Sequence, residues 1–585
     1  MHLVTTGWRE SWPQNGKVLF LGHWCLKWGD RDEWSGRKNE VLAYHWDDRA
    51  RLHRDFHYLT GVYEAYLAKI SAALNRVHGT SFSSRYWRIV VGPWLRYFID
   101  ILYDRFLSIQ GVVEDGRATR TTISREDLTD WVPVDFGSFG RLWGSDGWNH
   151  VIYGWLIRLL EAVPYDVQDI PSVPGPNIRL DRIEGPIKRS VKLLAAAARR
   201  IVPPSARKVA LVASYFSPRD LARILLPLGQ APMPWYPRVG VPDLPLNGRL
   251  RASLDLELVR NGFEEVLSRA IPLQMPKAYL EAFHSLRASA LDAFPRGAEV
   301  IHTANAYSSD EGFKVWAGES VERGAKLLIS QHGGMYGMGL WEQTEDHQVK
   351  VSDRFYSWGW DRTDTVNVRQ LPSGNLIRST RLLKWTPRGK ILWIFNTYPR
   401  YSYRMYSVPV AGQFRHYLAD QMEFGRALTP ETRRILRIRL YPKPDVDWDI
   451  RGRLVDGGFG DLIDPPLPFE EHVAQARLCV VTYNATTLLE TLAADIPTIV
   501  FWNPTFWELR PEAQAWFDRL RGVGIMHDTP SSAAAKVEEV RDDPRSWWSD
   551  PTVEEVHRGF CEKYANVPDD WSMRWRAELR CLASR

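Results

Sequence analysis

The segment of the sequence best suited to chemistry is a polar turn between a predicted strand at residues 478–482 and a predicted helix at residues 486–494. The first backbone N–H groups of a helix have no partner inside it, and the helix dipole makes this end positive, which favours a phosphate. We therefore predict that this region binds the phosphate of an activated donor through Thr482, Tyr483, Asn484, Thr486 and Thr487. Glu490 is expected to accept hydrogen bonds from a ribose, with Asn484 or Thr486 as the N-cap. A capped helix without a ligand is the alternative.

Further donor contacts are predicted at the end of a second strand, at residues 435–441. Arg439, Tyr441 and Lys443 flank this end. Arginine and lysine complement phosphate charge, and a tyrosine can stack on a base. A plain surface role for all three is the alternative.

A glycine-rich loop follows a third predicted strand, at residues 326–330. Gln331 and His332 stand at the end of that strand, and Gly333 and Gly334 allow the loop to approach a ligand closely. Because imidazole titrates near neutral pH, His332 is a candidate acid, base or phosphate-neutralising group. A structural histidine is the alternative. The spacing of His332 and His347 matches no strong metal pattern, so no metal is predicted.

Carboxylates for the chemical step are sought in two further segments. Asp310 and Glu311 are candidate catalytic groups, as base or nucleophile, and Asn305 a candidate cleft residue. Acids in a first helical turn are also ordinary partners of the helix dipole, so this alternative stays open. His45 and Asp47 are candidate acceptor contacts, although Asp47 or Asp48 capping the following helix is equally consistent with the pattern.

The elements that must position these residues alternate between strand and helix. Beyond the three strands already named, predicted strands lie at 17–24, 208–215, 299–303, 390–395, 461–463, 498–502 and 525–528. Alternation of this kind predicts parallel sheets covered by helices, an α/β fold. Long amphipathic helices at 47–77 and 84–108 precede most of these strands and are rich in aromatic residues. We therefore predict two Rossmann-like lobes with a helical, aromatic-rich N-terminal elaboration.

The expected domains follow from this order of elements. Residues 1–375 form an acceptor-side lobe with a helical insertion at about 110–205, and residues 376–550 form the nucleotide-sugar-binding lobe. A linker is placed at 371–389. Residues 551–585 form a tryptophan-containing helical tail that is expected to pack back on the first lobe.

Composition excludes several classes of protein. A net charge of +5 over 585 residues is weak for a nucleic-acid-binding protein, so no such partner is predicted. The 4 cysteines form no CxxC pair, which is typical of a reducing compartment. No run of about 18 apolar residues and no signal peptide is seen, so a cytoplasmic protein is predicted, with peripheral contact to the inner membrane left open. No cofactor is predicted, and the oligomeric state is left open.

Long motifs across the chain resemble the LIC12162-type transferases of bacterial surface-polysaccharide gene clusters. These motifs are LGHWC (21–25), YHWDDR (44–49), SSRYWRIVVGPWL (83–95), NAYSSDEGFKVWA (305–317), QHGGMYG (331–337) with SDRFYSWGW (352–360), RLYPKPDVDW (439–448) and TYNATTLLETLAADIPTIVFWNPTFWELR (482–510).

The resemblance implies a GT-B-like fold and a place in lipopolysaccharide, O-antigen or capsule assembly. It also implies a distant similarity to transferases that use CMP-activated ulosonic acids. The expected activity is transfer of a sugar from a nucleotide-activated donor to a glycan or lipid-linked glycan acceptor. A polyol-phosphate transferase, using a donor like CDP-glycerol, and a non-enzymatic scaffold in polysaccharide assembly are the alternatives.

Overall fold

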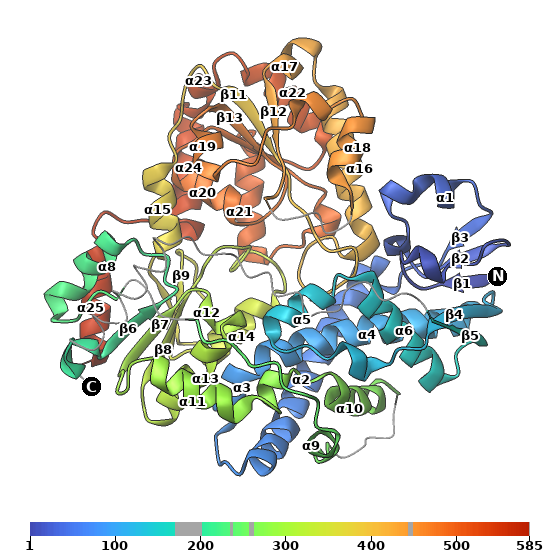
Figure 1. Cartoon of the computed structure of the whole chain (residues 1–585). Helices are drawn as coiled ribbons and strands as arrows, with labels where there is room; N and C mark the ends of the chain where they lie inside the picture. Colours follow the sequence, from blue (N-terminus) through green and yellow to red (C-terminus); the bar gives the residue numbers. More distant parts are fainter. Residues whose placement is uncertain (170–201, 234–237, 257–261, 443–447, 584–585) are drawn as a thin grey trace.

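The computed structural model describes residues 1–169, 202–233, 238–256, 262–442 and 448–583. Among them are three sheets, each of five parallel strands and each accompanied by helices (Figure 1). The α/β class predicted from the sequence is therefore confirmed. Lys443 lies outside the described residues.

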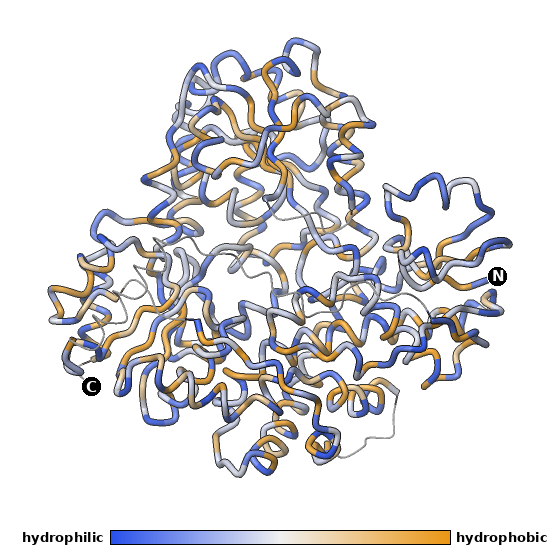
Figure 2. The backbone as a smooth tube through the Cα atoms, in the orientation of Figure 1, coloured by the Kyte–Doolittle hydropathy of each residue, from blue (hydrophilic) through white to orange (hydrophobic). Residues whose placement is uncertain are grey.

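The third sheet along the chain forms the upper lobe in Figure 1. Its strand order is β12-β11-β13-β14-β15. The strands are β11 (Lys390–Ile394), β12 (Leu436–Arg439), β13 (Ala476–Val481), β14 (Thr498–Phe501) and β15 (Met526–His527). The helices are α16 (Phe414–Ala427), α17 (Pro430–Arg434), α18 (Ile450–Asp456), α19 (Phe469–Val473), α20 (Thr486–Ala493), α21 (Pro511–Gly522), α22 (Pro530–Val540) and α23 (Pro544–Trp548). A parallel sheet is covered on both faces, which is why its strands are apolar runs (Figure 2).

The second sheet has the order β10-β9-β8-β7-β6. Its strands are β6 (Val209–Val212), β7 (Val300–Thr303), β8 (Lys326–Ser330), β9 (Arg354–Ser357) and β10 (Val368–Gln370). The helices of this region are α8 (Pro218–Leu225), α9 (Gly248–Ala252), α10 (Gly262–Gln274), α11 (Phe283–Ala293), α12 (Ala306–Ser309), α13 (Glu311–Glu322) and α14 (Gln343–Val351). Strands β9 and β10 were not predicted from the sequence.

The first sheet is the main difference from the sequence prediction, which placed one strand in the N-terminal region. The structure has five there, β1 (His2–Val4), β2 (Val18–Phe20), β3 (Asn39–Val41), β4 (Arg120–Ser124) and β5 (Tyr165–Gln168), in the order β3-β2-β1-β4-β5. Strands β3 and β5 are short and mostly exposed, so they carry no apolar run to detect. The accompanying helices are α1 (Arg31–Ser35), α2 (Arg49–His78), α3 (Ser84–Val90), α4 (Gly92–Asp115), α5 (Phe136–Leu142) and α6 (Asp146–Leu160).

The expected helical insertion and the expected linker contain regular elements that were not predicted. The described part of the expected insertion at 110–205 supplies β4 and β5 to the first sheet, and helix α15 (Gly374–Leu382) lies within the expected linker and packs on α20. The short strand predicted at 461–463 is wrong, because a 3-10 helix occupies Gly460–Leu462 and one bridge joins Ile463 to Ile438.

The C-terminal tail returns to the second sheet, as expected. Helix α24 (Pro551–Tyr564) packs on α20 and α21, and α25 (Trp571–Ala583) lies beside α8 and β6 in Figure 1. The indole of Trp575 is buried against Phe216 and Tyr356 and donates a hydrogen bond to the carbonyl of Pro372. None of the described helices combines the length and the apolar character needed to cross a membrane.

Candidate active site at the carboxyl ends of the second and third sheets

A cavity of about 550 Å³ lies where loops from all three sheet regions meet. The third sheet contributes its carboxyl ends, through residues 396–408 after β11, Tyr441 after β12 and residues 483–487 after β13. The second sheet contributes Gly334, Met335 and Glu342 after β8. Strand order reverses between β11 and β13, and open α/β sheets bind ligands at such a switch point.

The turn before α20 is built to receive a ligand. Ala485, not Asn484 or Thr486, is the N-cap residue, and it provides no side-chain cap for the first amides of the helix. Asn484 is 1% exposed and lines the cavity. Neither its amide nitrogen nor its amide oxygen has a hydrogen-bond partner in the described part of the chain. Since buried polar groups are nearly always paired, these two atoms are available to pair with a ligand in the cavity.

Of the other residues near this turn that were predicted to bind the activated donor, three line the cavity and Thr482 does not. Tyr483 and Thr487 line it, with their hydroxyl oxygens 2.6 Å apart. Thr486 also lines it, but its hydroxyl accepts a hydrogen bond of 2.8 Å from the backbone N–H of Gly334 on the facing loop. Thr482 is fully buried and donates to the carbonyl of Ile394, so it supports the sheet.

Glu490 faces helix α15 and does not line the cavity. Its carboxylate accepts hydrogen bonds from Ser379 at 2.7 Å and from Asn375 at 3.4 Å. Burial raises the pKa of Glu490 to about 7. The carboxylate expected at the ribose therefore lies at the contact between α15 and α20.

Arg439 and Tyr441 lie at a second cavity, of about 440 Å³, which adjoins the first and shares Thr397 and Tyr441 with it. Arg439 donates to the carbonyl of Leu467 and lies 2.5 Å from a ring nitrogen of His472. Tyr441 is 39% exposed and borders both cavities. Of the predicted basic residues here, only Arg439 is described.

The glycine-rich loop after β8 touches the N-terminus of α20. Gly333 has φ +147°, and a Cβ atom placed on it would lie 2.1 Å from the hydroxyl oxygen of Thr486. Gln331 anchors the start of the loop, because its buried amide oxygen accepts hydrogen bonds from the backbone of Trp358 and the indole of Trp360. Gln331 thus positions the loop and does not line the cavity.

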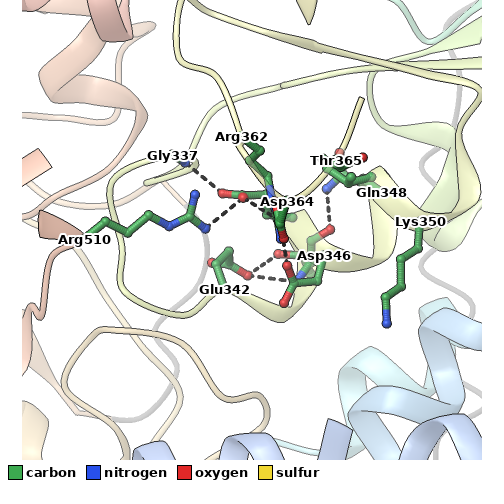
Figure 3. A network of polar contacts seen from close by, with 12 residues as sticks. Gly337, Glu342, Asp346, Gln348, Lys350, Arg362, Asp364, Thr365 and Arg510 are labelled. Carbon is green, nitrogen blue, oxygen red and sulfur yellow. Dashed lines mark hydrogen bonds and ion pairs between the residues drawn. The ribbon is translucent and has the colours of Figure 1, made fainter. Parts of the chain in front are cut away.

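A buried carboxylate ties the same loop to the third sheet. Glu345 on α14 accepts a hydrogen bond of 2.7 Å from the backbone of Gly337, and pairs with Arg362 at 3.1 Å and with Arg510 at 2.8 Å. In Figure 3, Arg510 reaches this cluster from the left and Arg362 reaches it from above. The Gly337 loop is therefore fixed relative to α21, which begins directly after Arg510.

His332 and Asn305 line a smaller side cavity of about 160 Å³. Burial is the main cause that lowers the pKa of His332 to about 4, so its imidazole is neutral at pH 7. Its Nδ1 atom has no hydrogen-bond partner among the described residues. Asn305 is exposed and donates to the hydroxyl of Tyr215.

Arg404 joins the two cavities, since it lines both. It lies 3.6 Å from Glu342, donates to the hydroxyl of Thr344 at 3.3 Å and stacks over the ring of Tyr406 at 3.8 Å. Arg404 is not among the residues predicted from the sequence. Directly after the predicted strand at 390–395, a run of polar and aromatic residues begins at Asn396, and Arg404 is its ninth residue. This run was the signal that could have identified Arg404.

The first sheet positions the loop that carries Arg404. Arg400 is buried, and its guanidinium pairs with Asp146 at 2.8 Å while also donating to the carbonyl of Trp24. The hydroxyl of Tyr401 donates to the same carboxylate. Asp146 is the first residue of α6, so the N-terminal region holds residues 400 and 401 in place.

Asp310 and Glu311 line none of the cavities described above. Asp310 is the N-cap of α13 and accepts from the backbone of Phe313. Glu311 is buried, pairs with Lys314 at 2.9 Å, and accepts hydrogen bonds from the backbone of Phe136 and the hydroxyl of Tyr279. Both carboxylates thus have structural partners.

His45 and Asp47 are also away from the main cavity. His45 packs between Tyr44 and Trp46 and lies 3.3 Å from Asp104. Asp47 borders a separate cavity of about 40 Å³. The residue that caps α2 is Asp48. In the described ranges, no three His, Cys, Asp or Glu side chains are grouped so as to hold a metal ion.

Comparison with known proteins places the chain in a family. A search of curated proteins finds no match. A structure of the wall teichoic acid polymerase TagF is similar at 8% sequence identity and a TM-score of 0.24, over 49% of this chain and 74% of that one. The model of the LIC12162 family of transferases matches residues 1–579. The chain therefore belongs to the LIC12162 family of transferases.

Proposed function

We propose that the protein is a glycosyltransferase that binds a nucleotide-activated sugar in the 550 Å³ cavity. One observation carries the proposal. Asn484 is buried with both amide atoms lacking a partner in the described chain, beside the N-terminus of α20 at the switch point of the third sheet. A nucleotide phosphate supplies the acceptor oxygens that such a site lacks.

The donor would be held by residues of both lobes. The first amides of α20, the side-chain amide of Asn484 and the guanidinium of Arg404 face the phosphate, and Arg404 offsets the negative charge that develops on it as the nucleotide leaves. Tyr441 and Tyr483 border the space open to the nucleoside. Stacking on an aromatic ring is a common way to hold a base.

The acceptor hydroxyl would be activated by His332. Because its imidazole is neutral at pH 7, it is available to take a proton, whereas a protonated imidazole would be needed to protonate the leaving phosphate. The hydroxyl oxygen then attacks the anomeric carbon, the bond from that carbon to the phosphate oxygen breaks, and the nucleotide leaves with the bonding electrons. This places His332, in the adjoining side cavity, next to the acceptor.

The finer substrate assignment rests on the family resemblance. We propose a CMP-activated ulosonic acid as donor and a surface-polysaccharide or lipopolysaccharide precursor, as a glycan or a lipid-linked glycan, as acceptor. The reaction would take place in the cytoplasm, with peripheral contact to the inner membrane where the acceptor is lipid-linked. No cofactor is invoked.

A thermal-shift screen followed by calorimetry tests the donor site. We expect CMP, CDP or UDP, or a nucleotide-sugar built on one of them, to raise the melting temperature of the full chain. In Asn484→Ala, the affinity for that nucleotide should fall about tenfold or more, which corresponds to the ~1.5–3 kcal/mol of a hydrogen bond to a charged group. The melting temperature without ligand should stay the same, because Asn484 makes no hydrogen bond in the described chain.

Asn15→Ala is the matched control, since Asn15 is exposed and lies in another part of the chain. It should bind the nucleotide like the unmodified protein. Equal affinity in the Asn484 and Asn15 variants would refute the proposed donor site. Selective stabilisation by CDP-glycerol would favour a polyol-phosphate transferase, and no response to any nucleotide would favour the scaffold.

A further inference from the structure

The side cavity of 160 Å³ holds more hydrogen-bond donors than the surrounding protein uses. Three nitrogen atoms that can only donate make no hydrogen bond of ordinary geometry to a described residue: Nη2 of Arg96, Nε of Arg404 and Nε2 of Gln343. The Gln343 side chain lies near the carboxylate of Asp100 and Arg404 lies near the hydroxyl of Tyr97, so both keep a weaker protein contact. Arg96 is 7% exposed and the Gln343 residue 3% exposed. All three side chains line the cavity.

The other polar atoms of Arg96 and Gln343 already form hydrogen bonds or ion pairs, which hold these two side chains in place. Arg96 on α4 donates to Thr60 at 2.9 Å and pairs with Asp100 at 3.1 Å. The amide oxygen of Gln343 accepts from the Nε atom of Arg96 and from the backbone of Met405, both at 3.3 Å. These two hydrogen bonds fix which end of the Gln343 amide is oxygen and which is the nitrogen Nε2. Turning the amide over would break both of them.

Two histidines extend the same pattern. His347 has no hydrogen-bond partner on either ring nitrogen in the described chain, and His332 has none on Nδ1. Both line the cavity. A neutral imidazole donates through one nitrogen and accepts through the other, so each can satisfy a ligand oxygen or a ligand hydroxyl.

A group that only accepts hydrogen bonds would satisfy the three obligate donors. Carboxylate and phosphate are the acceptor-only groups that guanidinium binds in bidentate geometry. The nucleotide phosphate is already assigned to the adjoining cavity, which leaves a carboxylate for this one. Each guanidinium already has one protein carboxylate nearby, Asp100 for Arg96 and Glu342 for Arg404, and still has a nitrogen left over. A ligand hydroxyl would satisfy fewer of these atoms, because it also needs an acceptor.

We propose that the side cavity binds the carboxylate of an acidic sugar, recognised by Arg96, Arg404 and Gln343. The inference rests on the proposed glycosyltransferase function and assigns the carboxylate of its acidic substrate to the residues of this cavity. The carboxylate belongs either to the transferred sugar or to the sugar unit that accepts it. Since Arg404 also borders the donor cavity, the acidic sugar would lie next to the nucleotide phosphate.

Matched ligands that differ in one carboxylate test the inference. We would titrate the full chain with UDP-glucuronic acid against UDP-glucose, and with CMP-N-acetylneuraminic acid against its carboxamide. Free glucuronate or free N-acetylneuraminate, added together with a nucleotide that carries no sugar, tests whether the accepting sugar carries the carboxylate. We expect the ligand that carries the carboxylate to bind at least tenfold more tightly than its neutral counterpart. If this preference appears with nucleotide-sugars, the transferred sugar carries the carboxylate. If it appears with the free sugars, the accepting sugar carries it.

Gln343→Glu is the decisive variant. It keeps an acceptor oxygen for Arg96 and Met405, so the local fold is retained, and it puts a negative oxygen where the free amide nitrogen was. Affinity for the carboxylate ligand should fall at least tenfold, while affinity for the neutral member should change less than twofold. Gln14→Glu, at an exposed position, controls for the added charge. Arg96→Lys provides a second variant with the same expected loss.

The outcomes separate the two proposals. If nucleotide-sugars bind with no preference for a carboxylate, the side-cavity assignment and the ulosonic acid donor are both overturned, while the glycosyltransferase function stands. A preference that Gln343→Glu and Arg96→Lys leave intact overturns the side-cavity assignment alone. If no nucleotide or nucleotide-sugar binds, the proposed function itself fails.

Discussion

At the scale of single residues, His332 and Asn484 mark the two adjoining cavities. Each has polar atoms without partners among the described residues, and Arg404 lies between the cavities they line. An unpaired buried polar group costs free energy in the protein without ligand, so its presence is explained by a ligand that pairs it. The lowered pKa of His332 keeps its imidazole neutral, and so able to accept a proton, at pH 7.

His332→Ala should remove the general base. We expect kcat to fall by about 10²–10⁴-fold, the usual contribution of such a group, with the KM for the donor little changed. Steady-state kinetics with the donor identified by the thermal-shift screen would measure both constants. His57→Ala, at an exposed histidine, should leave them unchanged. A kcat for His332→Ala within twofold of the unmodified protein would contradict the assignment.

Glu490 should make stability depend on pH. Its pKa is about 7 in the folded protein against an ordinary value of 4.5, so the folded state binds the proton more tightly. Stability from this group is present in acid and is lost as pH rises through 7. Glu490→Gln should therefore unfold at a higher temperature than the unmodified protein at pH 8, by roughly 1–3 kcal/mol in free energy. The difference should be clearly smaller at pH 5, which is close to the ordinary pKa of 4.5.

The charged neighbours of Glu490 are Arg378 and Glu470, which form an ion pair of 2.8 Å with each other. Glu471→Gln, at an exposed acid close by, is the control and should show no difference between the two pH values. Thermal unfolding of the three proteins gives the answer. The same shift for Glu490→Gln at pH 5 and pH 8 would exclude the proposed titration.

The residues that sequence could identify are those defined by local order along the chain. Tyr483, Asn484, Thr486 and Thr487 follow a strand and open a helix, and they do line the cavity. Glu490 shares the same helix, but its partner helix α15 comes from a segment with no readable periodicity. When the role of a residue depends on packing between distant segments, the sequence around that residue does not reveal the role.

At the scale of elements, the site depends on contact between the loop after β8 and the start of α20. The hydrogen bond from the backbone of Gly334 to Thr486 joins them, and no side chain fits between Gly333 and Thr486. The third sheet was predicted closely, since all five of its main strands were placed within about two residues. The first sheet was not, because its strands are short and β3 and β5 are partly polar.

Gly333→Ala should separate these two elements. The added Cβ atom would meet the Thr486 hydroxyl at 2.1 Å, and φ +147° is unfavourable for alanine by about 1–3 kcal/mol. We expect lower thermal stability and a loss of nucleotide affinity in calorimetry. Gly324→Ala also has a positive φ but no atom within 4 Å, so it should lower stability without changing nucleotide affinity. Unchanged affinity in Gly333→Ala would show that the contact is not part of the site.

At the scale of the whole molecule, buried ion pairs hold the three sheet regions around the cavity. Arg400 joins the third sheet to Asp146 of the first region, and Arg49 joins that region to Glu508. Glu345 joins the second sheet to Arg510. The cavity is thus formed by the assembly of all three regions, which is why its full lining could not be predicted from the motifs of one segment.

Glu345→Ala should weaken this assembly. It leaves Arg510 without its carboxylate and the backbone of Gly337 without its acceptor, and breaking a buried pair costs about 3–5 kcal/mol. Denaturant unfolding would measure the loss. Asp570→Ala breaks an exposed pair with Arg574 and should cost at most ~0.5 kcal/mol. Equal stability of the two variants would contradict a role for Glu345 in joining the sheets.

Hydrogen exchange of the full chain, with and without the nucleotide that stabilises it most, tests the central claim most directly. If the nucleotide binds where we propose, exchange should slow in the segments 331–342, 396–408 and 482–490, each of which contributes residues to the cavity lining. Another cavity, of about 430 Å³, lies between α15, α24 and α25 and is lined by Ile377, Arg558 and Trp571. Protection confined to that region, with none at 482–490, would contradict the account.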